Sequence, residues 1–253
     1  MTDMDMGTGT GMDTGAGTGT DTGTGMDTGT GTGAGTDTDT DTDTDTVSRR
    51  LRSGTRAWHE ALETTGFATA MLAGTLPLDR YVGQLATYRV VLEILETELA
   101  RATCPSVGSV WSPDLVKLPL VERDLHHFAA LGTAPEPCPA AEEFTDEIRR
   151  TAATEPRELL GFLYVLEGST LGALFLLRYV TEAYRLTDGN GVSYYGSGDR
   201  TRWAAFAERL DRALGEPDVQ ERVLAAAERA YHHVAVISRE LSVGLDSPAP
   251  EPV

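Results

Sequence analysis

After residue 46, apolar and polar positions alternate with the period of an α-helix. In the first such segment, the positions i, i+4, i+7 and i+11 are occupied by Leu51, Thr55, Trp58 and Leu62. Residues at this spacing share one face of a helix, and apolar residues on that face are typical of an amphipathic helix packed on a core. A single helix that begins near Ser48 is therefore predicted.

Six further helices are expected, with glycine and proline marking the loops between them. Gly66 and Gly74 bracket a loop, and Pro77 opens the second helix, which runs to Leu99. The remaining helices are expected after residue 113, near 139, over 156–186, over 200–214 and over 218–243. No segment shows the strict alternation of a β-strand. The sequence thus predicts an all-α fold of about seven helices.

The fifth expected helix is very apolar and contains two glycines four residues apart. Gly168 and Gly172 lie inside it, and each costs about 1 kcal/mol relative to alanine. Their spacing puts both on one helix face, where either a flat ligand or another helix could approach the bare backbone. Because Glu167 interrupts the apolar run, we do not expect this helix to span a membrane.

Composition divides the chain into one domain and two tails. Residues 1–46 consist mainly of Thr with Gly or Asp and contain no aromatic residue, so they are expected to be disordered, as are residues 244–253. Residues 47–243 are long enough for one domain with a single core. The first tail holds ten acidic and no basic residues, which leaves −8 of the formal charge of −18 on the rest. This balance argues against a nucleic-acid partner, which needs a basic face.

The cysteines and the first residues of the chain indicate in which cell compartment the protein is expected. Cys104 and Cys138 are isolated and lack CxxC spacing, so neither a zinc site nor a disulfide framework is predicted. The first residues lack the basic flank and apolar segment of a secretory signal. We therefore expect a cytoplasmic protein that is not bound to a membrane.

The first helix also carries a polar stripe with a candidate metal ligand. Arg52, Arg56, His59 and Glu63 follow one another at i, i+4, i+7 and i+11. A neutral imidazole could bind a metal through one nitrogen while Glu63, one turn on, accepts the other N–H. The arginines could pair with carboxylates of a ligand. A purely structural role for His59 is the alternative.

Three parts of the chain together resemble the bacterial haem oxygenases. They are LRSGTRAWHEALE, VKLPLVERDL, and YVLEGSTLGA followed by GVSYY, in the same order as in that family. The resemblance covers the body of the chain and omits the first tail. It implies that haem is both substrate and cofactor, and that dioxygen (O2) converts it to biliverdin, carbon monoxide and ferrous iron. Electrons would come from a donor such as ferredoxin with its reductase, because no glycine fingerprint for flavin or nicotinamide is present.

The resemblance also assigns roles around the iron. His59 matches the proximal haem ligand, and Glu63 matches the carboxylate that steadies it. Gly168 and Gly172 match the two glycines of the distal helix. Many family members have an aspartate directly after the first glycine, whereas this chain has Ser169. Ser169 is therefore a candidate for organising distal water, without an assigned essential role.

Four further residues match positions near the haem propionates. Arg52 matches a basic residue that faces a propionate, and Tyr164 matches a tyrosine near one. Arg200 and Arg202 match a basic cluster of some family members only loosely. The resemblance thus implies a propionate site formed by these side chains.

Two alternatives stay open at this point. A di-iron carboxylate oxidase would need several Glu and His ligands, which Glu228 with His232 and Glu122 with His126 could contribute at i, i+4 spacing. Such pairs are also routine on solvated helix faces. A haem or bilin carrier without turnover would keep His59 and the glycines, and Ser169 leaves this possibility open.

Overall fold

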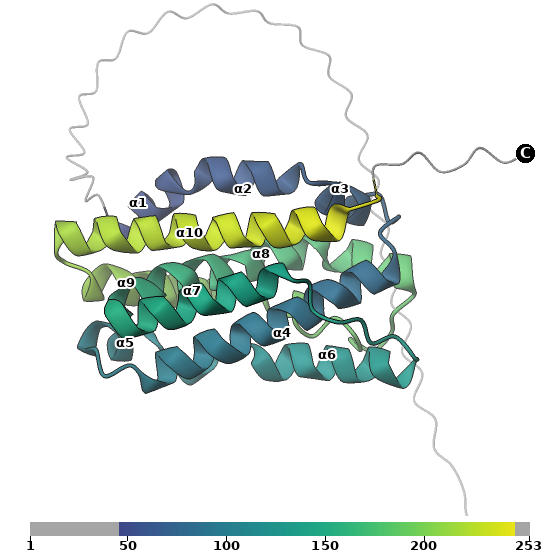
Figure 1. Cartoon of the computed structure of the whole chain (residues 1–253), viewed down its shortest axis with the longest axis horizontal. Helices are drawn as coiled ribbons and strands as arrows, with labels where there is room; N and C mark the ends of the chain where they lie inside the picture. Colours follow the sequence, from purple (N-terminus) through teal and green to yellow (C-terminus); the bar gives the residue numbers. More distant parts are fainter. Residues whose placement is uncertain (1–45, 246–253) are drawn as a thin grey trace, which may run out of the picture. The chain divides into compact units, whose positions relative to one another are not determined.

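The computed structural model describes residues 46–245, which form α-helices and 3₁₀ turns and, within that range, no β-strand (Figure 1). The α-helices are α1 (Val47–Gly54), α2 (Arg56–Glu63), α3 (Gly66–Leu72), α4 (Leu78–Arg101), α5 (Pro105–Val110), α6 (Leu118–Ala130), α7 (Ala140–Thr154), α8 (Leu159–Tyr184), α9 (Arg200–Ala213) and α10 (Pro217–Ser242). The 3₁₀ turns are η1 (Pro113–Leu115), η2 (Pro156–Glu158) and η3 (Tyr195–Ser197). The predicted all-α class is confirmed.

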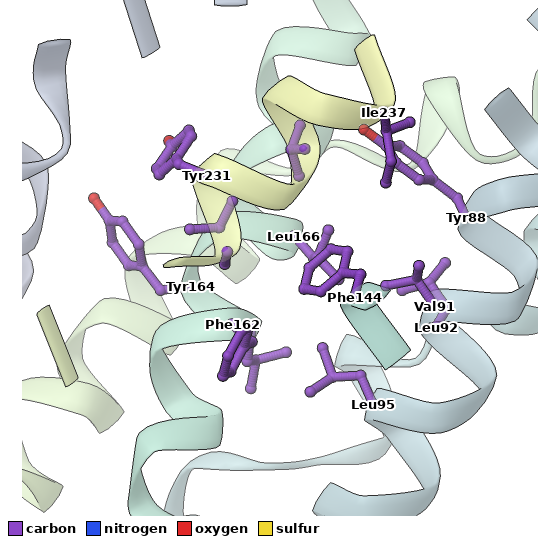
Figure 2. Close-up of a cluster of buried hydrophobic side chains, with 14 of the residues drawn as sticks. Tyr88, Val91, Leu92, Leu95, Phe144, Phe162, Tyr164, Leu166, Tyr231 and Ile237 are labelled. Carbon is purple, nitrogen blue, oxygen red and sulfur yellow. The ribbon is translucent and has the colours of Figure 1, made fainter. Parts of the chain in front are cut away.

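Three long helices, α4, α8 and α10, organise the core. Helix α10 packs along α8, and α4 packs on α6 and α7. The short helices α1, α2 and α3 all contact α10 and lie along it in Figure 1. Figure 2 shows the side chains of α4, α7, α8 and α10 meeting in the interior, where Leu95, Phe144 and Phe162 are at most 1% exposed. The hydrophobic effect of this shared core holds the four helices together.

The contact between α8 and α10 depends on a glycine. A Cβ atom on Gly161 would lie 2.7 Å from the backbone nitrogen of Ala227 and 2.8 Å from the Cβ of Ala226. Both distances are shorter than real Cβ atoms tolerate, and the Ala227 nitrogen belongs to backbone that cannot rotate away. Gly161 therefore allows a backbone approach that no other residue permits.

The prediction of about seven helices was wrong, because ten α-helices form in the described residues. The predicted first helix is divided at Thr55, whose hydroxyl donates to the Leu51 carbonyl at 2.7 Å. The segment after Gly66 was expected to be a loop, but it forms α3. Its N-cap, Thr65, accepts from a backbone N–H, and Phe67 and Met71, four residues apart, bury their side chains.

Helix α5 is the other helix that the pattern did not predict. Pro105 was expected only to end the preceding helix, but it stands in the first turn of α5, where its missing N–H costs nothing. Residues 1–45 and 246–253, which make up most of the two predicted tails, lie outside the described residues. Thr46 is described, and its hydroxyl caps α1 by accepting from the backbone nitrogen of Arg49.

Among the described residues, one helical segment is long and apolar enough to cross a membrane by length and composition alone. It is Pro156–Tyr184, which consists of η2 and α8. More than half of its most apolar stretch is buried inside the protein. The core helix of a folded domain has this property too, and the contact with α10 gives this helix that position.

The Gly161 contact leads to a prediction about stability. Replacing Gly161 with alanine should lower the free energy of unfolding by about 1–3 kcal/mol, because the new methyl group forces α8 away from α10. Denaturant unfolding followed by circular dichroism measures the change. Gly108→Ala is the matched control, since a Cβ there meets nothing within 4 Å, and it should be neutral or slightly stabilising. Equal stability of the two variants would contradict the close contact.

Candidate functional site

A cavity of about 480 Å³, called here the main cavity, lies among α2, α3, α4, α8 and α10 and the segment around η3. This volume is within the range of about 300–1,000 Å³ typical of small-molecule sites. Most of its wall is apolar. The polar or aromatic-hydroxyl side chains on the wall are those of His59, Glu63, Thr65, Gln84, Tyr88, Ser169, Tyr194, Tyr195, Tyr231 and Ser238. Such a mainly apolar wall with a few polar groups is suited to a flat organic ligand.

His59 and Glu63 form a pair on the wall of the main cavity. The Nδ1 atom of His59 lies 3.2 Å from Oε1 of Glu63, one turn further along α2. Both side chains are more than half exposed. Because Nδ1 faces the carboxylate, Nε2 is the nitrogen that is available to bind a metal. The two residues meet as the sequence predicts.

The two glycines of α8 have different surroundings. Gly172 lines the main cavity, and a Cβ there would meet nothing within 4 Å. Gly168 is absent from the cavity wall, and its missing side chain makes room for Trp203 of α9, whose ring atoms would lie 3.2–3.3 Å from a Cβ. Gly172 therefore faces open space, whereas Gly168 faces α9.

Haem makes three demands on a binding site, and the lining of the main cavity meets them. A flat ring needs a wall without projecting side chains, and Gly172 provides one. The iron needs a nitrogen donor held in a fixed orientation, and the pairing with Glu63 gives His59 that property. Apolar side chains of α3 and α8, among them Phe67 and Leu176, provide contact area for a macrocycle. The residues present fit haem.

Arg52 and Tyr164 lie close together but outside the wall of the main cavity. Tyr164 is 5% exposed, and burial raises its pKa to about 12, whereas the charge of Arg52 and the hydroxyl of Thr55 act in the opposite direction. Figure 2 shows Tyr164 and Tyr231 at one edge of the core. Burial raises the pKa of Tyr231 as well, and the hydroxyl of Thr55, at the break between α1 and α2, acts against the rise in both tyrosines.

Arg200 and Arg202 begin α9, and neither lines the main cavity. Arg200 is exposed. The Nε atom of Arg202 donates to Oε1 of Glu167 at 2.7 Å, and its Nη2 donates to the carbonyl of Ser197 at 2.7 Å. Arg202 is therefore engaged with the residue that directly precedes Gly168.

Glu167 is the centre of a buried ionic group that the sequence analysis missed. It is 2% exposed, and its Oε2 lies 2.8 Å from Nζ of Lys117, which is 3% exposed. Burial lowers the pKa of Lys117, and the neighbouring Glu167 opposes that shift. Because each buried charge has a partner, the group ties α8 to α9 and to the segment before α6.

A second buried carboxylate holds the segment between α8 and α9. Asp124 of α6 is fully buried, and its oxygens accept from the backbone nitrogens of Ser193 at 2.7 Å and Tyr194 at 2.8 Å. Burial raises the pKa of Asp124, whereas these two hydrogen bonds act against the rise. Asp124 lies three residues after Val121 and four before Phe128, so helical spacing puts it on the buried face of α6, whereas Glu122, the other acid of that helix, is exposed. Tyr194, the neighbour of Asp124 in the fold, reaches the cavity wall.

The described residues contain no group of three or more His, Cys, Asp or Glu side chains arranged to hold a metal ion. Glu122 and His126 lie exposed on α6, whereas Glu228 and His232 lie on α10. His232 instead packs edge-on against the Trp58 ring, at 5.9 Å between ring centroids. The di-iron alternative is therefore not favoured.

Comparison with known proteins agrees with this description. The sequence model of the family described as "Heme oxygenase" matches residues 45–240. "Heme oxygenase 1" of the cyanobacterium Nostoc sp. is 26% identical over 193 residues, which cover 73% of this chain and 81% of that protein. "Heme oxygenase 1" of Synechocystis sp. is 26% identical over 187 residues, covering 72% and 76%.

Solved structures show the same fold. The crystal structure of heme oxygenase-1 from Synechocystis sp. in complex with heme superposes with a TM-score of 0.71 at 24% identity, covering 79% of this chain and 94% of that one. The heme oxygenase from Leptospira interrogans gives a TM-score of 0.70 at 24% identity, covering 77% and 99%. The family match spans most of the chain and includes α1 to α9 and nearly all of α10. The resemblance seen in the sequence is thus confirmed, and the chain belongs to the haem oxygenase family.

Proposed function

We propose that this protein is a haem oxygenase that binds haem in the main cavity and opens it to biliverdin, carbon monoxide and ferrous iron. The observation that carries the proposal is the His59–Glu63 pair on the wall of that cavity, in a chain of the haem oxygenase family. Relatives named heme oxygenase, and solved structures described as complexes with heme, support it.

In this proposal His59 holds the substrate through Nε2. Glu63 accepts the Nδ1–H, which fixes the tautomer and the plane of the ring and makes Nε2 a better donor. Bound haem supplies the iron that activates dioxygen, and its ring is also the substrate that is opened.

Helix α8 forms another part of the cavity wall and would determine how closely the haem ring approaches it. Gly172 leaves space for the ring to approach the helix backbone, and Ser169, one turn earlier, offers a hydroxyl beside it. Apolar side chains around these residues exclude bulk water. Fixed orientation of the ring relative to α8 would restrict attack to one ring edge.

Arginine and tyrosine side chains outside the cavity wall would bind the propionates. Arg52 and Tyr164, which lie close enough for the arginine charge to affect the tyrosine, are the pair that we assign to one propionate. Arg200 is exposed. It would reach a carboxylate at the cavity rim only if the haem ring extended toward α9. Arg202 would have to share its guanidinium between a propionate and Glu167.

The reaction also requires dioxygen and electrons from outside the chain. We propose a donor such as ferredoxin with its reductase, since no flavin or nicotinamide fingerprint occurs in the sequence. We also propose a cytoplasmic location. Cys104 and Cys138 are unpaired in the structure, which fits a reducing compartment.

Replacing His59 with alanine tests the ligand assignment. The variant should lose biliverdin formation by more than the roughly 10–100-fold that loss of an outer-shell partner costs a metal site, because the ligand itself is gone. Its stability should change little, since the side chain is more than half exposed. Absorption spectra under turnover with ferredoxin, its reductase and NADPH measure the product. His126→Ala, an exposed histidine of α6, is the control and should retain full activity.

Retention of biliverdin formation in His59→Ala would reject the assignment. A wild-type protein that binds haem but never opens the ring would instead identify a haem carrier without turnover. No haem binding by the wild type would contradict the proposed function itself.

Replacing Gly172 with leucine tests the role of the bare backbone. The side chain would enter the open space above α8, so oxygen consumption with bound haem should fall strongly. The free energy of unfolding should be unchanged or about 1 kcal/mol higher, because a helix-interior glycine is replaced without a clash. An oxygen electrode and thermal unfolding give the two measurements. Unchanged oxygen consumption would count against ligand approach at Gly172.

A further inference from the structure

The first turn of α9 and the segment just before it pack closely on one face of α8. Arg202 donates to Glu167 at 2.7 Å. A Cβ atom on Gly198 would lie 2.5 Å from the carbonyl oxygen of Thr170 and 3.0 Å from the Cβ of Leu174, so a side chain has no room there. Glu167, Thr170 and Leu174 follow one another at i, i+3 and i+7 and therefore share that face. The start of α9 consequently has a fixed position along α8.

From this position Trp203 reaches the neighbouring face of α8, which bears the two glycines. Its Cη2 and Cζ3 atoms would lie 3.2 and 3.3 Å from a Cβ atom on Gly168. One turn earlier on α8, the Tyr164 ring packs against the Trp203 ring at 5.3 Å between centroids. On α9 itself, the fully buried Phe206 packs against the same indole at 5.6 Å. The indole is thus held between α8 and its own helix.

The indole explains why only one of the two glycines faces the main cavity. Gly168 and Gly172 are four residues apart and share a helix face, yet only Gly172 lines the cavity. The half-buried indole of Trp203 covers the backbone at the other glycine. A flat ring that moved along this face from Gly172 would meet the indole within one helical turn, or about 5 Å. Trp203 is therefore placed to limit how far a ligand extends along α8.

The position of the ring along α8 matters for the product. Haem has four meso carbons of similar chemistry, so the carbon that is opened depends on which ring edge is held in the reacting position. Apolar contacts select between such orientations by shape. A single methylene in a hydrophobic pocket changes a preference by roughly 10–200-fold. An indole at the end of the cavity is large enough to make that selection.

We infer that Trp203 is a specificity-determining residue: it limits the haem ring to the part of α8 around Gly172 and thereby decides which meso carbon is opened. The inference deepens the proposed function and rests on it. Trp203 also packs against Tyr164, which we assign to a propionate. The same indole would therefore border the propionate end of the ligand.

The biliverdin isomers that wild type and variants form test this role. Wild type should give mainly one isomer. Trp203→Leu removes most of the indole and should raise the ratio of minor to major isomers at least about tenfold, because a second ring orientation becomes accessible. Trp203→Phe keeps an aromatic ring and should give an intermediate ratio, so the test does not depend on the folding of one variant. Liquid chromatography separates the isomers.

Trp111→Leu is the matched control. Trp111 directly follows α5, is half-buried like Trp203, and lies outside the wall of the main cavity. The same substitution there should leave the isomer ratio unchanged. A purely structural role of Trp203 would change stability or turnover in both leucine variants without changing the isomer ratio in either.

Two further readouts need no turnover. In the ferric cyanide complex, the proton resonances of the haem methyl groups report the in-plane orientation of the ring, and we expect one set in wild type and two in Trp203→Leu. Without haem, Gly168→Ala should raise the midpoint of denaturant unfolding more in Trp203→Leu than in wild type. Loss of the indole makes room for the new methyl group, so the two substitutions are coupled.

The outcomes separate this inference from the proposed function. A wild type that binds haem but never opens it would defeat the proposed function, while the methyl resonances would still decide what orients the ring. A haem complex whose isomer ratio and methyl resonances are the same in wild type and Trp203→Leu would overturn the inference alone. So would equal effects of Gly168→Ala in the two backgrounds, since the indole would then not cover that glycine.

Discussion

The close approach of α8 to α10 at Gly161 is the constraint on which the arrangement of the site depends. Helices α1, α2 and α3 also pack against α10, so the position of His59 relative to α8 depends on α10. Further along the same two helices, Gly172 and Tyr231 line the main cavity. One tight backbone contact thus determines how the histidine helix and the glycine helix face the same space.

Buried charge fixes the far side of α8. Glu167 is paired with Lys117 and Arg202, and it lies on α8 between Val165 and Ser169, which line the cavity. Removing one member of a buried ionic group leaves an uncompensated charge, which is costly, so the group resists displacement of α8. Asp124 does the same for the segment that bears Tyr194, through two backbone hydrogen bonds. The main cavity therefore has walls that are positioned before a ligand arrives.

The sequence predicted those parts of the fold and site that depend on local spacing. Long periodic segments such as α4, α8 and α10 were foreseen, and so was the meeting of His59 with Glu63, because residues four apart on a helix are neighbours. Helix α3 was missed, since Gly66 is read as a loop signal although tertiary burial of Phe67 and Met71 stabilises a helix there.

The spacing of residues along the sequence could not predict contacts between distant parts of the chain. Nothing local shows that Gly168 faces Trp203 while Gly172 faces open space. The roles of Asp124 and Tyr194 depend on a contact between residues 70 positions apart. Such pairings follow from the packing of whole helices and become visible only in the folded chain.

The central claim is that His59 and α8 together enclose haem, and a crystal structure of the ferric haem complex tests it most directly. The account predicts iron bound to Nε2 of His59, Nδ1 still facing Glu63, and the ring lying against the backbone at Gly172. Iron bound to another side chain, or a ring outside the main cavity, would contradict it.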